Sequence, residues 1–187
     1  MALIGWSLIK AVMGIRVSVQ EEIEALDLGE HGNTCYPDVV LRKTIPIAVG
    51  TALGSMMRGE PRVTVIFFGE GATEEGVFHE SINFAALKQL PVVFVCENNL
   101  YSVYSPLSVR QPRGREVFLL ARGHEVESHQ GDGSDVVEVS RLAEQAIRKA
   151  REGGGASFVE FKTYRWREHC GPYYDNHLGY RTEEEFL

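Results

Sequence analysis

The residues with the clearest chemical potential in this chain are one carboxylate and a pair of carboxamides, each placed just after an apolar run. Glu70 stands between two glycines behind the run 63–68, and Asn98 and Asn99 follow the run 92–96. Carboxylate and amide oxygens are ligands that suit Mg²⁺, which in proteins commonly also holds phosphate. This pattern indicates a site in which a divalent cation joins the protein to a diphosphate.

The flanking segments predict that these residues reach one edge of a parallel sheet. The runs 63–68 and 92–96 are continuous and apolar, as expected for strands covered on both faces. The segment 74–89 between them has helical periodicity, and Thr73 is placed to cap it. In such a strand–helix–strand unit, both strands deliver their last residues to the same edge, where backbone N–H groups at the helix start can meet an anion.

The rest of the chain continues this alternation. Pro46 is expected to open a helix rich in small residues, and Ser134 or Asp135 is expected to cap a helix that runs to about Glu152. The core face of that last helix is predicted to consist of Val136, Val139, Leu142, Ala146 and Ile147. Further expected elements are a short helix at 116–123, a strand at 124–127, a turn at 131–134 and a strand at 157–164. Together they predict an α/β fold of three layers (α/β/α) around a mostly parallel sheet.

Composition narrows the function further. The chain has 187 residues and a net charge of −7 without a basic run, which weighs against a general nucleic-acid or membrane-surface binder. No signal peptide or membrane span is expected, and three widely spaced cysteines favour free thiols and a cytoplasmic location. We expect residues 1–36 to be a segment without a recognisable motif and residues 37–187 to form a single domain.

Gly69-Glu70-Gly71 is also compatible with a simple tight turn, and two asparagines after a strand can be turn residues. A dinucleotide fingerprint would need a third glycine at position 74, where the chain has Glu74, and a phosphate-binding P-loop would need a following Gly-Lys-Ser/Thr. The pairing of two such strand ends favours a ligand site over turns, and a flavodoxin-like or dinucleotide-binding domain remains a weaker alternative.

The residues from Gly69-Glu70-Gly71 to Asn98-Asn99 resemble the motif of thiamine diphosphate-dependent enzymes, which begins Gly-Asp-Gly and ends Asn-Asn about thirty residues later. More narrowly, the chain is similar to the α subunit of the decarboxylating component of 2-oxo acid dehydrogenases, of the pyruvate, branched-chain or acetoin type. The supporting stretches are 44–54, 67–101, 131–139 and 158–171. The resemblance implies the thiamine diphosphate-binding fold, and a version of that subunit shortened at both ends.

The resemblance also implies cofactors and residue roles. Thiamine diphosphate and Mg²⁺ would be the cofactors, and Glu70, Asn99 and the backbone carbonyl of Tyr101 would hold the metal. His169 would line the reaction centre as the catalytic residue, although without the resemblance it is better explained as a solvated loop histidine, and Arg165 as a surface charge. The cofactor-binding residues would be Gly69, Gly71, Ala72, Asn98 and Arg165.

A β subunit would complete the enzyme, because in this family it supplies the carboxylate that activates the cofactor. An α2β2 assembly is therefore implied, and the chain alone is not expected to be active. The alternative is a catalytically inactive remnant that associates with itself as a structural or interaction protein. That alternative rests on the shortened ends and on Glu70, which stands where the motif more widely has Asp and is one methylene longer.

Overall fold

The protein is described by a computed structural model that covers residues 37–182, with side chains from residue 44 onward. Residue contacts separate Met1–Val39 from Val40–Leu187, and the description below concerns the second unit. The expectations for residues 1–36, including the boundary after residue 36, lie outside the described part. No helix among the described residues is long and apolar enough to cross a membrane.

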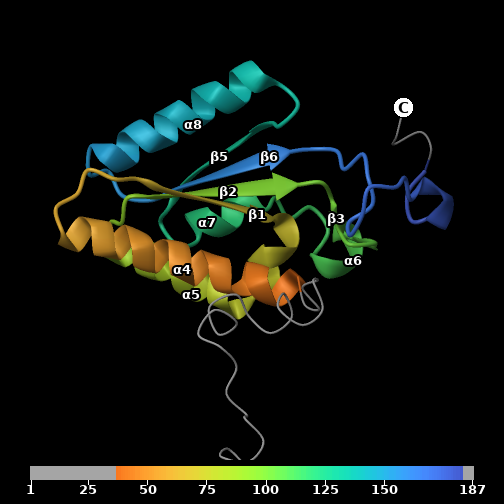
Figure 1. Ribbon diagram of the computed structural model, residues 1–187, viewed down its shortest axis with the longest axis horizontal. Coiled ribbons are helices and arrows are strands. Elements are labelled where there is room, and N and C mark those ends of the chain that lie inside the picture. The colour runs from red at the N-terminus through yellow and green to blue at the C-terminus, as the bar shows by residue number, and fades with distance from the viewer. Residues whose placement is uncertain (1–36, 183–187) are drawn as a thin grey trace, which may run out of the picture. The chain divides into compact units, whose positions relative to one another are not determined.

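A four-stranded parallel sheet forms the centre of this unit (Figure 1). Its strands lie in the order β1-β2-β6-β5, and every neighbouring pair is parallel. Because parallel strands require crossovers, a helical segment lies between successive strands along the chain. The α/β prediction is confirmed. The strands are β1 (Thr64–Gly69), β2 (Val92–Asn98), β5 (Glu127–Asp132) and β6 (Ser157–Lys162).

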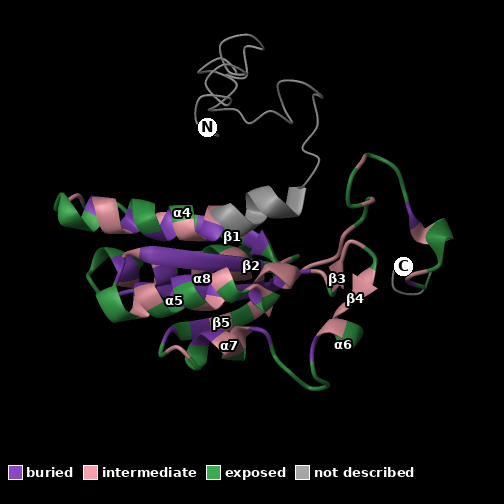
Figure 2. Cartoon of the chain, turned by 90° about the horizontal axis from the view of Figure 1, so that it is seen from below, coloured by how far each residue is buried: buried purple, intermediate pink, exposed green. Residues whose placement is uncertain are grey.

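Helices cover both faces of the sheet and make the three layers (Figure 1). Helix α8 (Val136–Arg151) packs on one face, and α4 (Pro37–Met57), α5 (Gly76–Lys88) and α7 (Phe118–Arg122) lie on the other. Buried and exposed residues alternate around α4 and α5, as expected for helices with one face on a core (Figure 2). The short elements are η1 (Glu70–Glu74), β3 (Tyr101–Ser102), β4 (Ser105–Pro106), α6 (Leu107–Arg110) and η2 (Asn176–Leu178).

The core divides into two clusters because successive strand residues face opposite sides of the sheet. Alternate residues of β2 and β6 therefore belong to different clusters. The first cluster, toward α4, α5 and α7, includes Ile45, Ala52, Ile66, Phe68, Phe78, Ile82, Phe94 and Phe158. The second, toward α8, consists of Val93, Val95, Leu142, Ala146, Ala150, Val159 and Phe161, with Val63, Val139 and Ile147 packed against it.

Strand β1 is not covered on both faces, so that expectation was wrong. Ile66 and Phe68 are buried, but Val65 is 37% exposed and Phe67 is 58% exposed. The reason is position: β1 is an edge strand, and α8 packs against β2, β5 and β6 on that face. An apolar run therefore identified the strand correctly but overstated its burial.

Three helix details also differ from expectation. Helix α4 begins at Pro37, so Pro46 lies inside it and removes one internal hydrogen bond rather than opening the helix. Thr73 does not cap α5, because η1 comes first and the Thr73 hydroxyl donates to the Glu70 carbonyl at 2.6 Å. Val136 is 77% exposed at the first turn of α8, and is not part of its core face. Capping of α8 by Asp135 is confirmed, since its carboxylate accepts from two backbone N–H groups.

Strand β5 lies later than expected. The strand predicted at 124–127 lies at Glu127–Asp132, and the turn predicted at 131–134 is confined to 133–134. The strand is polar and contains a glycine, so its sequence is typical of a turn. Pairing along the whole length of β6, from Glu127 opposite Ser157 to Asp132 opposite Lys162, outweighs that local preference.

Two phenylalanines on neighbouring strands allow a matched test of this packing. Phe94→Ala, at a fully buried position, is expected to lower the free energy of unfolding by about 3–5 kcal/mol, because it leaves a cavity in the first cluster. Phe67→Ala, at the exposed position of β1, is expected to cost about 1 kcal/mol or less. Urea denaturation measures both, and equal losses would contradict the described burial.

Candidate functional site

The sheet brings the two strand ends of the predicted site side by side. Gly69 lies opposite Glu97 in the parallel register of β1 and β2, so Glu70 and Asn98 leave adjacent strands at the same edge. Both side chains are buried, Glu70 at 1% exposure and Asn98 at 0%. Buried polar side chains need hydrogen-bond partners, and those partners define the geometry of the site.

Gly71 allows the segment after β2 to approach the segment after β1. A Cβ atom at Gly71 would lie 3.0 Å from the Ser102 hydroxyl oxygen and 3.2 Å from its Cβ, closer than side chains normally pack. Only a residue without a side chain fits here without a shift of Ser102. The hairpin of β3 and β4 therefore lies directly against η1, which places Tyr101 and Ser102 beside Glu70 and Gly71.

The two asparagines shape the turn that carries Tyr101. The Asn98 side-chain oxygen accepts the N–H of Leu100 at 2.9 Å, and that of Asn99 accepts the N–H of Tyr101 at 3.1 Å. Leu100 has a φ of 69°, a left-handed conformation that bulky side chains rarely adopt, and the hydrogen bond that its N–H donates to Asn98 holds it there. Asn98 is thus buried in the fold, whereas Asn99 is only half-buried at the edge of the sheet.

Glu160 fixes the side chain of Asn98, and the sequence did not predict it as a site residue. It lies on β6 at 0% exposure, and its carboxylate accepts from the Asn98 side chain at 2.6 Å. Three more donors reach it: the Phe118 N–H at 2.9 Å, Gln130 at 3.1 Å and the Lys162 ammonium at 2.9 Å. The signal in the sequence was a charged residue inside the apolar run of a strand, which is uncommon unless the charge is paired.

The donors around Glu160 keep it ionised. Burial by itself raises the pKa of Glu160, but the hydrogen bonds from Lys162, Asn98 and Gln130 outweigh it, so the pKa lies below the usual value. Burial also raises the pKa of the neighbouring Cys96 thiol well above its usual value, and the charges of Glu160 and Glu70 raise it further. Cys96 is therefore a neutral core residue and not a nucleophile.

Glu70 pairs with an arginine that the sequence did not point to. Arg110, at the end of α6, approaches the Glu70 carboxylate to 2.6 Å, and its side chain is 11% exposed. The same guanidinium also binds Glu74, and its Nε donates to the Ser105 carbonyl at 3.1 Å. Because Arg110 is forty residues from Glu70, no local pattern could have connected the two.

Arg165 faces the hairpin that carries Tyr101. Its Nη2 donates to the carbonyl of Val103 at 2.7 Å and to the Tyr180 hydroxyl at 3.1 Å, and Asp175 lies 3.6 Å away. Its Nη1 is buried and has no hydrogen-bond partner among residues 37–182. His169 is exposed in the following loop, and within the described residues no hydrogen bond joins it to the other predicted site residues.

These residues fit a metal–diphosphate group in their donor chemistry. Glu70, Asn99 and the Tyr101 carbonyl offer only oxygen atoms, as Mg²⁺ prefers, and the unpartnered Nη1 of Arg165 is a donor suited to a phosphate oxygen. Among the described residues, no group of three or more His, Cys, Asp or Glu side chains could hold a metal, so a metal here depends on amide and carbonyl ligands. The guanidinium of Arg110 now occupies the place of a cation at Glu70.

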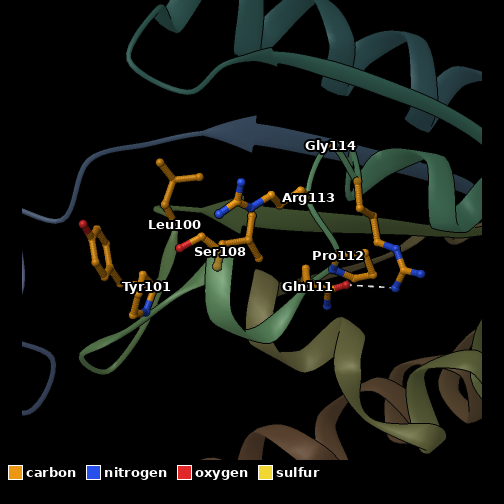
Figure 3. A pocket seen from close by; sticks show the side chains of 10 residues that line it. Leu100, Tyr101, Ser108, Gln111, Pro112, Arg113 and Gly114 are labelled. Carbon is orange, nitrogen blue, oxygen red and sulfur yellow. Dashed lines mark hydrogen bonds between the residues drawn. The ribbon is translucent and has the colours of Figure 1, made fainter.

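A cavity of about 370 Å³ opens beside this edge of the sheet. Residues of the segment after β2 line it, including Leu100, Tyr101, Leu107, Gln111, Arg113 and Arg115, and Figure 3 shows the hydrogen bond from Arg115 to Gln111. Gln111 also donates to Glu74 at 3.0 Å, which ties the wall of the cavity to the ion pair at Glu70. The segment that carries Arg110 therefore borders both the cavity and the candidate cation site.

Comparison with known proteins adds independent information. The profile of the family described as "Dehydrogenase E1 component" matches residues 28–186. The chain is 37% identical over 139 residues to the α subunit of acetoin:2,6-dichlorophenolindophenol oxidoreductase of Bacillus subtilis, covering 74% of this chain and 40% of that protein. It is 39% identical over 132 residues to the pyruvate dehydrogenase E1 component subunit alpha of Porphyra purpurea, covering 67% of this chain and 38% of that protein. The chain thus spans about two fifths of the length of these relatives.

The buried network around Glu160 predicts a pH-dependent stability. Glu160→Gln is expected to lower the free energy of unfolding by about 2 kcal/mol at pH 7, because buried donors lose a charged acceptor. Since folding lowers the pKa of Glu160 from about 4.5, the stabilisation is present above that pH and is lost as the pH falls through the folded-state pKa. The difference in the free energy of unfolding between wild type and Glu160→Gln should therefore become smaller in acid.

Urea denaturation at a series of pH values measures this difference. Glu144→Gln, at an exposed position of α8, is the control and is expected to change stability little at any pH. A stability difference between wild type and Glu160→Gln that stays constant or grows below pH 4.5 would contradict the assigned direction of the Glu160 pKa shift.

Proposed function

This chain belongs to the dehydrogenase E1 component family, and from that premise we propose that it is the cofactor-anchoring domain of an α subunit. In this proposal the domain holds the diphosphate of thiamine diphosphate through Mg²⁺, for oxidative cleavage of a 2-oxo acid or of acetoin. The names of three relatives refer to acetoin, pyruvate and 2-oxoisovalerate. We therefore propose only a substrate class, a 2-oxo acid or acetoin. A cytoplasmic location stays a prediction.

The observation that supports the proposal best is the close approach of two segments at the carboxyl edge of the sheet. Gly71 has no side chain, so the hairpin with Tyr101 lies against η1, and Glu70 and Asn99 follow two adjacent strands at this edge. In open parallel sheets, ligands bind in the crevice at this edge. The unpartnered Nη1 of Arg165 supplies the remaining donor for an anion.

The family resemblance gives each residue a role in this proposal. Glu70, Asn99 and the Tyr101 carbonyl hold the cation, while the N–H groups of Gly71 and Ala72 and the guanidinium of Arg165 bind phosphate oxygens. Asn98 and Glu160 fix the turn that carries Tyr101. When bound, thiamine diphosphate would supply an electron sink for the carbanion formed as the carbon–carbon bond breaks. His169, exposed in its loop, is the proposed catalytic residue.

A partner chain completes the proposed enzyme. In this family the β subunit activates the aminopyrimidine ring of the cofactor. We assign that role to none of the described residues near Glu70. We therefore propose a β partner and an α2β2 assembly, and we expect the chain alone to bind cofactor without turning over substrate.

A second candidate function is self-association without catalysis. It is favoured by apolar side chains that the described fold leaves exposed: Val65 and Phe67 on β1, Ile47 and Met57 on α4, and Leu87 on α5. Val65 and Phe67 lie on the sheet face away from α4 and α5, and exposed apolar side chains such as these mark an interaction surface. A second copy of this chain is the proposed occupant, and this role does not require cofactor.

Sedimentation velocity tests the second candidate. A dimer is expected for the chain alone, and Phe67→Glu is expected to shift it toward monomer because it places a charge in the contact. Glu80→Gln, an exposed position on α5, serves as a control. A wild-type chain that remains monomeric at high concentration would eliminate this candidate.

Cofactor binding tests the proposed function. Thiamine diphosphate with Mg²⁺ is expected to raise the melting temperature, because a ligand at 100 times its Kd adds about 2.7 kcal/mol to the folded state. Glu70→Ala is expected to abolish the shift. Glu97→Ala removes an exposed carboxylate from the same sheet edge, and is expected to leave the shift intact.

The absence of a shift for the wild-type chain at millimolar cofactor, with a β subunit added, would contradict the proposed function. An undiminished shift in Glu70→Ala would contradict the assignment of the metal ligand while leaving cofactor binding in place.

A further inference from the structure

Arg110 forms an ion pair with Glu70, the carboxylate that would hold the cation. An Arg110 nitrogen lies 2.6 Å from one Glu70 oxygen. Mg²⁺ binds carboxylate oxygens at about 2.0–2.1 Å and requires near-ideal octahedral geometry. Arg110 contacts one of the two Glu70 oxygens, and a metal on either oxygen would lie close to the guanidinium, so repulsion between the two cations weakens metal binding while Arg110 stays at this position.

Burial explains why an arginine is needed at this point. Glu70 is 1% exposed, and a buried carboxylate without a partner is strongly disfavoured. Among the described residues, Arg110 provides the only ion pair that Glu70 makes. The guanidinium also lies over the Gly71 peptide, where its Nη1 would be 3.5 Å from a Cβ atom. It is therefore located where the cofactor-binding turn begins.

Besides Glu70, Arg110 has two further partners, which it must also give up if it moves away from this position. Its Nη1 pairs with Glu74, and its Nε donates to the Ser105 carbonyl at 3.1 Å. It ends α6, a helix of only four residues, and the Gln111 N–H closes that turn on the Leu107 carbonyl at 2.8 Å. So short a helix is easily opened. Arg110 can leave Glu70 if this turn opens and the bonds to Glu74 and Ser105 break.

We propose that Arg110 is a resident counter-ion that competes with the divalent cation for Glu70 and thereby sets the affinity of the site for metal. The proposal rests on the proposed function for the location of the cation site. Metal binding releases Arg110 and loosens 107–111, one wall of the cavity described above. By linkage, whatever holds Arg110 on Glu70 weakens metal binding by the same factor.

Manganese binding to Arg110→Gln tests the competition. Gln keeps an N–H donor near Glu70 but removes the charge, and Mn²⁺ shares the oxygen preference of Mg²⁺ and is visible by electron paramagnetic resonance. Without thiamine diphosphate, the variant is expected to bind Mn²⁺ at least about fivefold more tightly than wild type. Arg113→Gln is the matched control, because it makes the same charge change at an exposed position on the same segment. Its affinity is expected to change by less than about twofold, because solvent screens the charge.

Hydrogen exchange of the wild-type chain is the second measurement and needs no variant. Added Mg²⁺ is expected to speed exchange of the Gln111 amide, since release of Arg110 loosens the turn that protects it. Unchanged or slower exchange of this amide with Mg²⁺ would overturn the proposal. Equal or weaker Mn²⁺ binding by Arg110→Gln, or an equal gain in Arg113→Gln, would also overturn it.

The two proposals fail separately. Calorimetry with thiamine diphosphate and Mg²⁺ on the wild-type chain reports on the proposed function alone. If the cofactor binds and Arg110→Gln leaves Mn²⁺ affinity unchanged, the competition is wrong and the function stands. If Arg110→Gln binds Mn²⁺ more tightly and thiamine diphosphate does not bind, the competition stands and the cofactor assignment is wrong.

Discussion

The charge of Glu160, buried at the carboxyl edge of the sheet, is the constraint on which the rest of the candidate site depends. Four donors from different parts of the chain meet its carboxylate: Asn98, Phe118, Gln130 and Lys162. The bonds from Asn98, Phe118 and Gln130 tie the end of β2, the start of α7 and β5 to β6, the strand that carries both Glu160 and Lys162. Because a buried carboxylate cannot exchange these donors for water, the turn that carries Tyr101 has one low-energy arrangement.

Glu70, at the same edge of the sheet, has fewer partners than Glu160. It is nearly as buried as Glu160, yet among the described residues its carboxylate has one charged partner, Arg110. A carboxylate with several fixed donors is structural, whereas one with a single displaceable partner is ready to exchange that partner for another cation. This contrast supports the proposal that Glu70 binds a ligand while Glu160 positions its neighbours.

The sequence predicts what depends on local patterns. Apolar runs located β1 and β2, and Asp135 marked the start of α8, as the structure confirms. Features set by distant residues could not be predicted in this way. Polar β5 became a strand because it pairs with β6, and Phe67 is exposed because α8 does not reach the edge strand. Arg110 is the clearest example, because only the folded chain brings it to Glu70. The assigned roles of His169 and Arg165 rest on the family resemblance and stay predictions.

A cation at Glu70 that joins this edge of the sheet to a diphosphate is the centre of the proposed function. Pulsed electron–nuclear double resonance on Mn²⁺ bound with thiamine diphosphate tests it most directly, since it detects phosphorus nuclei in contact with the metal. We expect a ³¹P coupling of protein-bound Mn²⁺ in the wild-type chain that disappears in Glu70→Ala. Mn²⁺ and thiamine diphosphate that both bind without such a coupling, or a coupling that persists in Glu70→Ala, would contradict it.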